Sequence, residues 1–176
     1  MRVHKDLTPS NILIDENFEP QISDFSQSMF FPKFEFTNEN MKKYNLIYYT
    51  DPYILKNNGR FHQKSDIFSF AIIALQILSG SVEIYEEFDN LDELIEEIKN
   101  GLMPIFPDNI PDEMNQLLAS CLSLEIKNRP LFSVICNKLE KIYESIHEIS
   151  SEKFKEYKEK ITGQTEKEEL NPKIKK

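Results

Sequence analysis

The sequence predicts a mainly α-helical fold, of the α+β class, with one small β-hairpin, and two observations support this expectation. Two short strand-like runs, Ile12–Ile14 and Gln21–Ser23, are separated by a polar segment that is typical of a hairpin turn. Beyond residue 64, apolar residues recur at helical spacing in four longer segments. We therefore expect a bundle of helices that builds the core and a hairpin that adds little to it.

The first part of the chain is expected to hold the hairpin and then a long loop. Asp15, Asn17 and Pro20 favour a turn between the two strands. Residues 24–52 follow, and they are rich in Phe, Asn and Tyr without a stable period. A stretch of this length without its own pattern is typical of a functional loop.

A central helix is predicted to begin at Ser65 or Asp66. Ten of the twelve residues from Ile67 to Leu78 are apolar, and Gly80 follows as a stop signal. A helix that is apolar on all sides needs cover on all sides. We therefore expect this helix to lie at the centre of the fold.

Three further helices are predicted after the central one. Residues 91–99 place Leu91, Leu94, Ile95 and Ile98 on one face, which indicates an amphipathic helix. Residues 112–124 and 132–149 are expected to form two more. From residue 150 the chain is rich in Lys and Glu, so residues 150–176 are expected to be a charged tail, partly helical or disordered.

The net charge of −9 is unevenly distributed and disfavours two classes of partner. The tail from Glu152 carries eight Lys and six Glu, so the preceding residues carry 13 basic and 24 acidic groups. An acidic body disfavours nucleic acid and anionic membranes as partners. The sequence shows no signal peptide and no apolar run long enough to cross a bilayer. We expect an intracellular, cytoplasmic location.

Glycine and cysteine usage excludes several kinds of site. The four glycines, at positions 59, 80, 101 and 163, lie too far apart for a glycine-rich phosphate loop. Cys121 and Cys136 have neither the spacing nor the neighbouring histidines of a zinc finger. Two cysteines also make no disulfide framework, which is typical of a reducing compartment.

The strongest functional signal lies in the first 26 residues. The run His4-Lys5-Asp6-Leu7-Thr8-Pro9-Ser10-Asn11 is followed, after the hairpin, by Asp24-Phe25-Ser26. Phosphoryl transfer requires one carboxylate to orient the attacking hydroxyl and oxygen ligands to hold Mg²⁺. A tight loop can present Asp6 and Asn11 on one side, and the hairpin returns Asp24 beside them. A polar turn and an ordinary hairpin would be the simpler alternative.

These two motifs resemble those of the eukaryotic protein kinases, whose catalytic loop reads H-R-D-L-x-x-x-N and whose metal-binding motif is D-F-G. The run Pro-Ser-Asn-Ile-Leu, residues 9–13, resembles the same segment in the serine/threonine and tyrosine-kinase-like groups. The resemblance implies that Asp6 is the catalytic base and that Lys5 belongs to the catalytic loop. It also implies that Asn11 and Asp24 are the magnesium ligands that hold ATP, and that His4 is a structural anchor.

Later motifs resemble the same family in the same order. Tyr49-Thr50-Asp51-Pro52-Tyr53 stands at the place of A-P-E, which closes an activation segment over residues 24–53. The resemblance implies that Asp66 anchors the backbone of the catalytic loop. It also implies that Arg129, in Asn128-Arg129-Pro130, pairs with the A-P-E glutamate. Residues 1–149 are thus expected to form the larger, C-terminal lobe of a kinase.

The sequence also departs from the family pattern. Only three residues precede His4, so these residues do not include the smaller lobe with its glycine-rich loop and lysine. Ser26 replaces the D-F-G glycine, Thr8 a lysine of the catalytic loop, and Lys5 the arginine of H-R-D. Tyr53 stands where the A-P-E glutamate is expected. We therefore predict that Arg129 finds another acceptor or lies partly exposed.

The resemblance implies transfer of the ATP γ-phosphate to protein Ser or Thr hydroxyls, with ATP and Mg²⁺ as cofactors. Because half of the nucleotide site is absent, we expect these residues alone to be inactive. Two alternatives remain open: a pseudokinase-like lobe that only binds proteins, and a truncated product without function. We also expect exposed apolar surface on the central helix, covered by a protein substrate or a binding partner.

Overall fold

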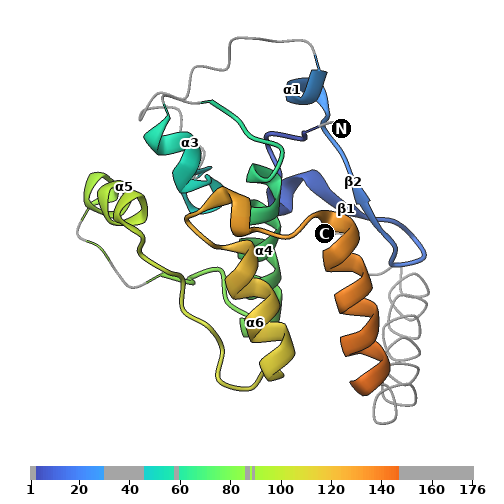
Figure 1. Ribbon diagram of the computed structural model, residues 1–176. Helices are drawn as coiled ribbons and strands as arrows, with labels where there is room; N and C mark the ends of the chain where they lie inside the picture. The colour runs from blue at the N-terminus through green and yellow to red at the C-terminus, as the bar shows by residue number, and fades with distance from the viewer. Residues whose placement is uncertain (1–2, 30–45, 58–59, 86–87, 89, 147–176) are drawn as a thin grey trace, which may run out of the picture. The chain divides into compact units, whose positions relative to one another are not determined.

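The computed structural model describes residues 3–29, 46–57, 60–85, 88 and 90–146. It divides into two compact units, residues 1–135 and residues 136–176. The first unit holds a two-stranded antiparallel sheet and a set of helices (Figure 1). The predicted class, mainly α with a small hairpin, is confirmed.

The hairpin joins β1 (Ile12–Ile14) to β2 (Pro20–Ile22), with Ile12 opposite Ile22 and Ile14 opposite Pro20. Its second strand begins one residue earlier than the sequence predicts. The turn is organised by Asp15, whose Oδ1 accepts hydrogen bonds from the backbone N–H groups of Asn17 and Glu19, at 2.8 and 2.9 Å. The hydrogen bond from Glu19 is the main cause that lowers the pKa of Asp15. A short 3-10 helix, η1 (Pro9–Asn11), precedes β1.

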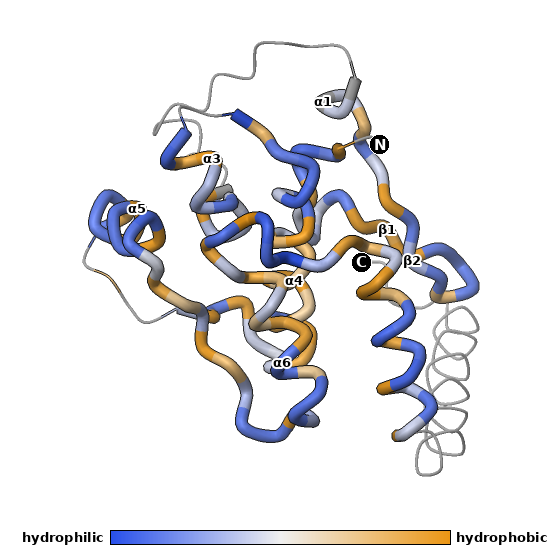
Figure 2. The backbone as a smooth tube through the Cα atoms, viewed as in Figure 1, coloured by the Kyte–Doolittle hydropathy of each residue, from blue (hydrophilic) through white to orange (hydrophobic). Residues whose placement is uncertain are grey.

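The central helix α4 (Ser65–Ser79) begins where the sequence predicts and ends at Gly80, whose φ of +67° closes the helix in the left-handed conformation. It packs against α6 (Asp112–Cys121) and against the 3-10 helix η2 (Leu46–Tyr49). Apolar residues run along most of α4 (Figure 2). The cover is incomplete at the C-terminal end, where Ile77 is 75% exposed.

The amphipathic helix α5 (Leu91–Asn100) buries Leu94, Ile95 and Ile98, the face that the sequence indicates. Asn90 caps its N-terminus by accepting a hydrogen bond from the Glu93 N–H at 2.8 Å. This helix packs against α3 (Pro52–Lys56). The sequence pattern did not predict α3.

Two other expectations differ in detail. The predicted loop over residues 24–52 contains two short elements, α1 (Ser26–Met29) and η2, while residues 30–45 lie outside the described part. The helix predicted over residues 112–124 ends at Cys121, and a last 3-10 turn, η3 (Ile126–Asn128), precedes Arg129. Elements of three to five residues give no periodic signal, because one turn of helix does not repeat.

A final helix covers residues 132–146, and the boundary between the two units falls inside it. The expected end of the lobe, at residue 149, lies outside the described residues and stays a prediction. The charged tail over residues 150–176 lies outside the described residues. Within the described part, no helix is both long and apolar enough to cross a membrane.

Candidate functional site

The catalytic-loop motif is held in place by the first turn of α4. Asp66 accepts backbone hydrogen bonds from His4 N–H through Oδ2, at 2.6 Å, and from Lys5 N–H through Oδ1, at 2.9 Å. Lys5 has a φ of +74°, a strained conformation for a residue other than glycine. Burial raises the pKa of Asp66, although the two N–H donors oppose this shift. This arrangement fixes the loop backbone to the helix that forms the core.

His4 links the catalytic loop to the segment after β2. Its ring is buried, and Nε2 lies 2.9 Å from the carbonyl oxygen of Ser23, while Nδ1 accepts the Asp6 N–H at 3.3 Å. These contacts fit one neutral tautomer, in which Nε2 carries the proton. The ring also meets the Phe25 ring edge-on, with centroids 4.9 Å apart. His4 therefore holds the two motifs together.

Asn11 is tied to Asp6 on one side and to the end of β2 on the other. Its Nδ2 donates to the Asp6 carbonyl oxygen at 2.7 Å and to Asp6 Oδ2 at 3.0 Å. Its own carbonyl oxygen accepts from the N–H and the hydroxyl of Ser23, at 2.8 and 3.1 Å. Asp24 directly follows Ser23 in the chain. These hydrogen bonds therefore bring Asp6, Asn11 and Asp24 into one neighbourhood.

Asp24 is exposed and has a φ of +56°. Its Oδ1 accepts the hydroxyl of Ser26 at 2.6 Å and the Ser26 N–H at 3.3 Å, and these bonds lower the pKa of Asp24. The left-handed residue of this turn is Asp24, whereas Ser26 begins α1 with helical backbone. Serine in place of glycine is therefore accommodated without strain at position 26.

The chain differs from the family at two positions of the catalytic loop that carry a cation there. Thr8 replaces a lysine, and Lys5 replaces an arginine. Thr8 is buried, and its hydroxyl shares a hydrogen bond of 2.8 Å with the hydroxyl of Ser10. The ammonium of Lys5, predicted as part of the catalytic set, lies 5.7 Å from the centre of the Phe61 ring. A cation over an aromatic face is stabilised there.

The donor set fits a magnesium ion. Because Nδ2 of Asn11 is occupied by Asp6, its Oδ1 is the side-chain atom left for a ligand. An amide oxygen and a carboxylate are ligands that Mg²⁺ takes, together with waters and phosphate oxygens. Among the described residues, no group of three or more His, Cys, Asp or Glu gathers to hold a metal alone.

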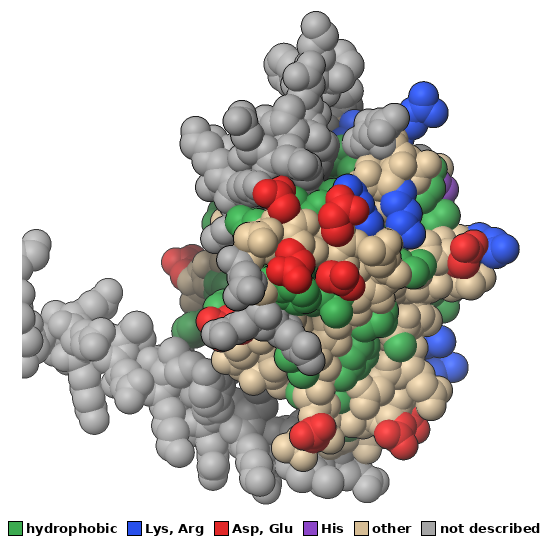
Figure 3. Space-filling model, turned by 90° about the vertical axis from the view of Figure 1, so that its left-hand side faces the viewer, with side chains coloured by type: hydrophobic (Ala, Val, Ile, Leu, Met, Phe, Trp, Pro, Cys, Tyr) green, Lys and Arg blue, Asp and Glu red, His purple; other side chains and the backbone are tan. Residues whose placement is uncertain are grey.

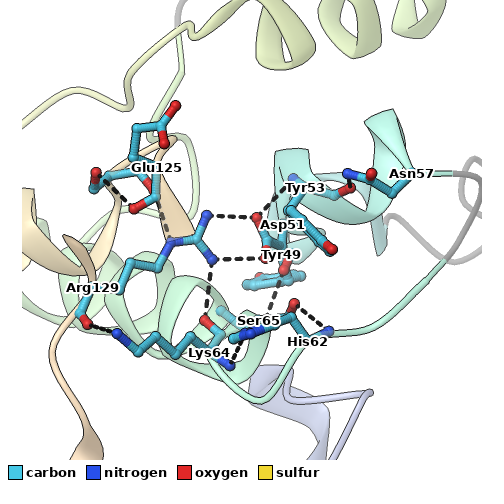
Figure 4. Close-up of polar contacts among 11 residues, drawn as sticks. Tyr49, Asp51, Tyr53, Asn57, His62, Lys64, Ser65, Glu125 and Arg129 are labelled. Atoms are coloured by element: carbon cyan, nitrogen blue, oxygen red, sulfur yellow. Dashed lines mark hydrogen bonds and ion pairs between the residues drawn. The ribbon is translucent and has the colours of Figure 1, made fainter. Parts of the chain in front are cut away.

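Arg129, predicted as an anchor, is 1% exposed and has found another partner (Figure 4). Its Nη1 and Nη2 donate to Asp51 Oδ2 and Oδ1, both at 2.7 Å. Nε donates to the Ser123 carbonyl, Nη1 also donates to the Lys64 carbonyl, and the guanidinium lies 5.4 Å from the Phe68 ring centre. The structure thus shows the first of the two predicted outcomes.

Asp51 is the residue that the sequence analysis missed. It is fully buried and also caps α3, because its Oδ1 accepts the N–H of Tyr53 at 2.9 Å. A signal was present: an acidic residue directly before Pro52 is typical of a helix N-cap followed by proline. Tyr53, where the family places glutamate, instead packs edge-on against His62.

A shallow apolar groove of about 380 Å³ lies between the catalytic loop and the end of α4. Its lining residues are Pro9, Ile12, Ile73, Gln76, Ile77, Gly80, Ser81 and Val82. Val82 is 79% exposed at its rim. On another face, α5 carries the exposed acidic side chains Asp92, Glu93, Glu96 and Glu97, and acidic groups gather there in Figure 3.

The chain matches the family model "protein tyrosine and serine/threonine kinase" over residues 1–139. It is 33% identical over 137 residues to the megakaryocyte-associated tyrosine-protein kinase of Rattus norvegicus, which covers 78% of the chain and 28% of that relative.

Two relatives from Dictyostelium discoideum give similar matches. The dual specificity protein kinase shkA is 31% identical over 147 residues, covering 80% of the chain and 27% of the relative. A protein named as a serine/threonine-protein kinase is 31% identical over 141 residues, covering 80% of the chain and 10% of the relative. The chain thus spans less than a third of the length of these relatives.

Proposed function

Because the chain belongs to the protein tyrosine and serine/threonine kinase family, we propose that it is the catalytic-loop part of a kinase domain. The reaction would transfer the γ-phosphate of ATP to a protein hydroxyl. The observation that carries this proposal is the connection of Asp6, Asn11 and Asp24 through the hydrogen bonds of Asn11 with Asp6 and Ser23. Each residue type matches a role that phosphoryl transfer requires.

The roles follow from the chemistry of the side chains. Asp6 would accept a hydrogen bond from the substrate hydroxyl, orient its oxygen and take its proton as the oxygen attacks phosphorus. Asn11 Oδ1 and the Asp24 carboxylate would hold Mg²⁺. The ion, when bound, neutralises charge on the phosphate oxygens. The hydrogen bond from Asn11 Nδ2 to Asp6 Oδ2 would hold the base and this metal ligand in a fixed relative position.

These 176 residues carry only part of the site. They contain no glycine-rich loop, and Thr8, which replaces a lysine of the family's catalytic loop, supplies no charge. Cations that face the transferred phosphate contribute strongly to phosphoryl transfer. We therefore infer that the 176 residues by themselves are inactive, and that turnover requires the phosphate-binding half of a kinase domain.

We propose Ser and Thr as the accepting residues. The run Pro9-Ser10-Asn11-Ile12-Leu13 supports this assignment, and similar relatives carry serine/threonine, dual specificity and tyrosine kinase names. The assignment is tested by joining these residues to the phosphate-binding half of a kinase domain and incubating that protein with Mg²⁺, ATP and matched Ser, Thr and Tyr peptides. We expect phosphate on Ser or Thr by mass spectrometry. Phosphate on Tyr alone would overturn the assignment.

A second candidate function rests on the apolar groove. A lobe that only binds other proteins would explain exposed Ile77 and Val82 and the loss of charge at Thr8. We propose that a helix or partner covers the end of α4 in the cell. Absence of phosphate on all three peptides would favour this binding role over catalysis.

A further inference from the structure

We propose that Ser26 is a positioning residue for Asp24, holding one carboxylate oxygen so that the other faces a divalent cation. This inference rests on the proposed function, because it takes Asp24 as a metal ligand. It concerns the place where this chain departs from the family motif D-F-G, since glycine at position 26 would have no side-chain donor.

The two carboxylate oxygens of Asp24 differ in their hydrogen bonding. Oδ1 accepts both the hydroxyl of Ser26, at 2.6 Å, and the backbone N–H of Ser26, at 3.3 Å. Within the described part of the chain, no hydrogen bond reaches Oδ2. The lone pairs of Oδ2 therefore stay available to a hard cation.

The backbone supports the same assignment. Asp24 has a φ of +56°, which aspartate tolerates when its short side chain bonds to nearby groups. The two donors of Ser26 supply those bonds and restrict rotation of the carboxylate. Asp24 is also exposed, so without Ser26 its side chain would sample several rotamers.

Asn11, the second proposed ligand, is fixed independently of Ser26. Its side chain is oriented by Asp6, and its carbonyl oxygen is bonded to Ser23, next to Asp24. Outer-shell groups that orient metal ligands typically change metal affinity by about 10- to 100-fold when they are removed. The hydroxyl of Ser26 is an outer-shell group of this kind, because it donates a hydrogen bond to the proposed ligand Asp24.

The test uses the complete 176-residue chain and Mn²⁺ alone as the probe, followed by paramagnetic broadening of backbone amide signals. The variants are Ser26→Ala, which removes the hydroxyl, and Ser26→Thr, which keeps it. Amides of α5 serve as an internal reference for nonspecific binding to exposed carboxylates. Three-bond couplings in the metal-free protein report the Asp24 rotamer.

We expect Mn²⁺ to broaden the Asn11 and Asp24 signals in the wild type, and Ser26→Ala to weaken this binding about tenfold. Ser26→Thr should bind close to wild type, and only Ser26→Ala should show rotamer averaging at Asp24. Equal or tighter binding by Ser26→Ala would overturn the inference while leaving the metal site standing. No broadening at Asp24 in the wild type would overturn the metal role itself, and the inference with it.

Discussion

In the buried pair of Asp51 and Arg129, the chain keeps the arginine of the family motif but supplies its carboxylate partner from a different position. A lone buried guanidinium is strongly destabilising, so a carboxylate within reach is required. The family pattern places this carboxylate on residue 53, where the chain has tyrosine. Asp51, two residues earlier, reaches the guanidinium with both oxygens.

Asp51→Asn is expected to lower the free energy of unfolding by about 3–5 kcal/mol, because Arg129 would keep a buried charge without its counterion. Asparagine can still accept the N–H of Tyr53, so the cap of α3 is retained. Urea denaturation of the whole chain measures the loss. Tyr53→Phe is the matched control, and its stability should stay near wild type. A loss below about 1 kcal/mol for Asp51→Asn would contradict this assignment.

Asp66 is expected to make the stability of the fold depend on pH. Burial raises the pKa of Asp66 above its ordinary value of 3.8, so the folded state binds the proton more tightly than the unfolded state. The stabilisation from this group is therefore full below the ordinary value and is lost as the pH rises through the folded-state pKa.

Asp66→Asn removes this titration. Relative to wild type, the stability of the variant should therefore rise with pH from the ordinary pKa to above the folded-state value. Urea denaturation at several pH values from strongly acidic to neutral measures the difference. A difference that stays constant with pH, or falls, would show that burial does not raise the pKa of Asp66.

The proximity of site residues was predictable where the spacing of a motif fixes their positions, whereas their roles stay predictions. The motif spacing indicates that Asp6, Asn11 and Asp24 converge, and the structure brings them together through Ser23. Neither the Asp51 pairing nor the Ser26 bonds could be derived in this way. Both depend on how a short helix begins, and on which of two neighbouring side chains turns inward.

At the scale of elements, the C-terminal end of α4 is incompletely covered. Ile77 and Val82 are 75% and 79% exposed beside the apolar groove. Apolar surface of this kind favours association in water. We therefore expect the 176-residue chain to self-associate through this groove when no partner covers it.

Replacing Ile77 and Val82 together by glutamine is expected to reduce this association and to change stability little, since both side chains are already exposed. Sedimentation velocity over a range of concentrations measures the association. Met103→Gln is the matched control, because Met103 is also exposed but lies outside the groove. A wild-type chain that stays monomeric at all concentrations would contradict the expectation.

The longer elements were predictable from pattern alone. The apolar run of α4 and the single apolar face of α5 each repeat over several turns of helix. The short elements α1, η2 and α3 depend on caps and on tertiary contacts instead. Such contacts form only when distant parts of the chain meet.

At the scale of the whole molecule, the first unit joins a catalytic loop to a helical core through Asp66, and it joins the end of the activation segment to the same core through Arg129. Both links tie functional segments to α4 or to the loops beside it. The two compact units divide at residue 135, inside the helix over residues 132–146. A continuous helix gives no sequence signal for such a division.

The central claim is that Asp6, Asn11 and Asp24 form the base and metal half of a phosphoryl-transfer site. Transfer of labelled phosphate from ATP by these residues joined to the phosphate-binding half of a kinase domain, compared between wild type and Asp6→Asn, tests it most directly. Glu97→Gln, an exposed carboxylate on α5, is the matched control. We predict transfer by wild type and Glu97→Gln, and a loss of about 100-fold or more for Asp6→Asn. Equal transfer by wild type and Asp6→Asn would contradict the claim.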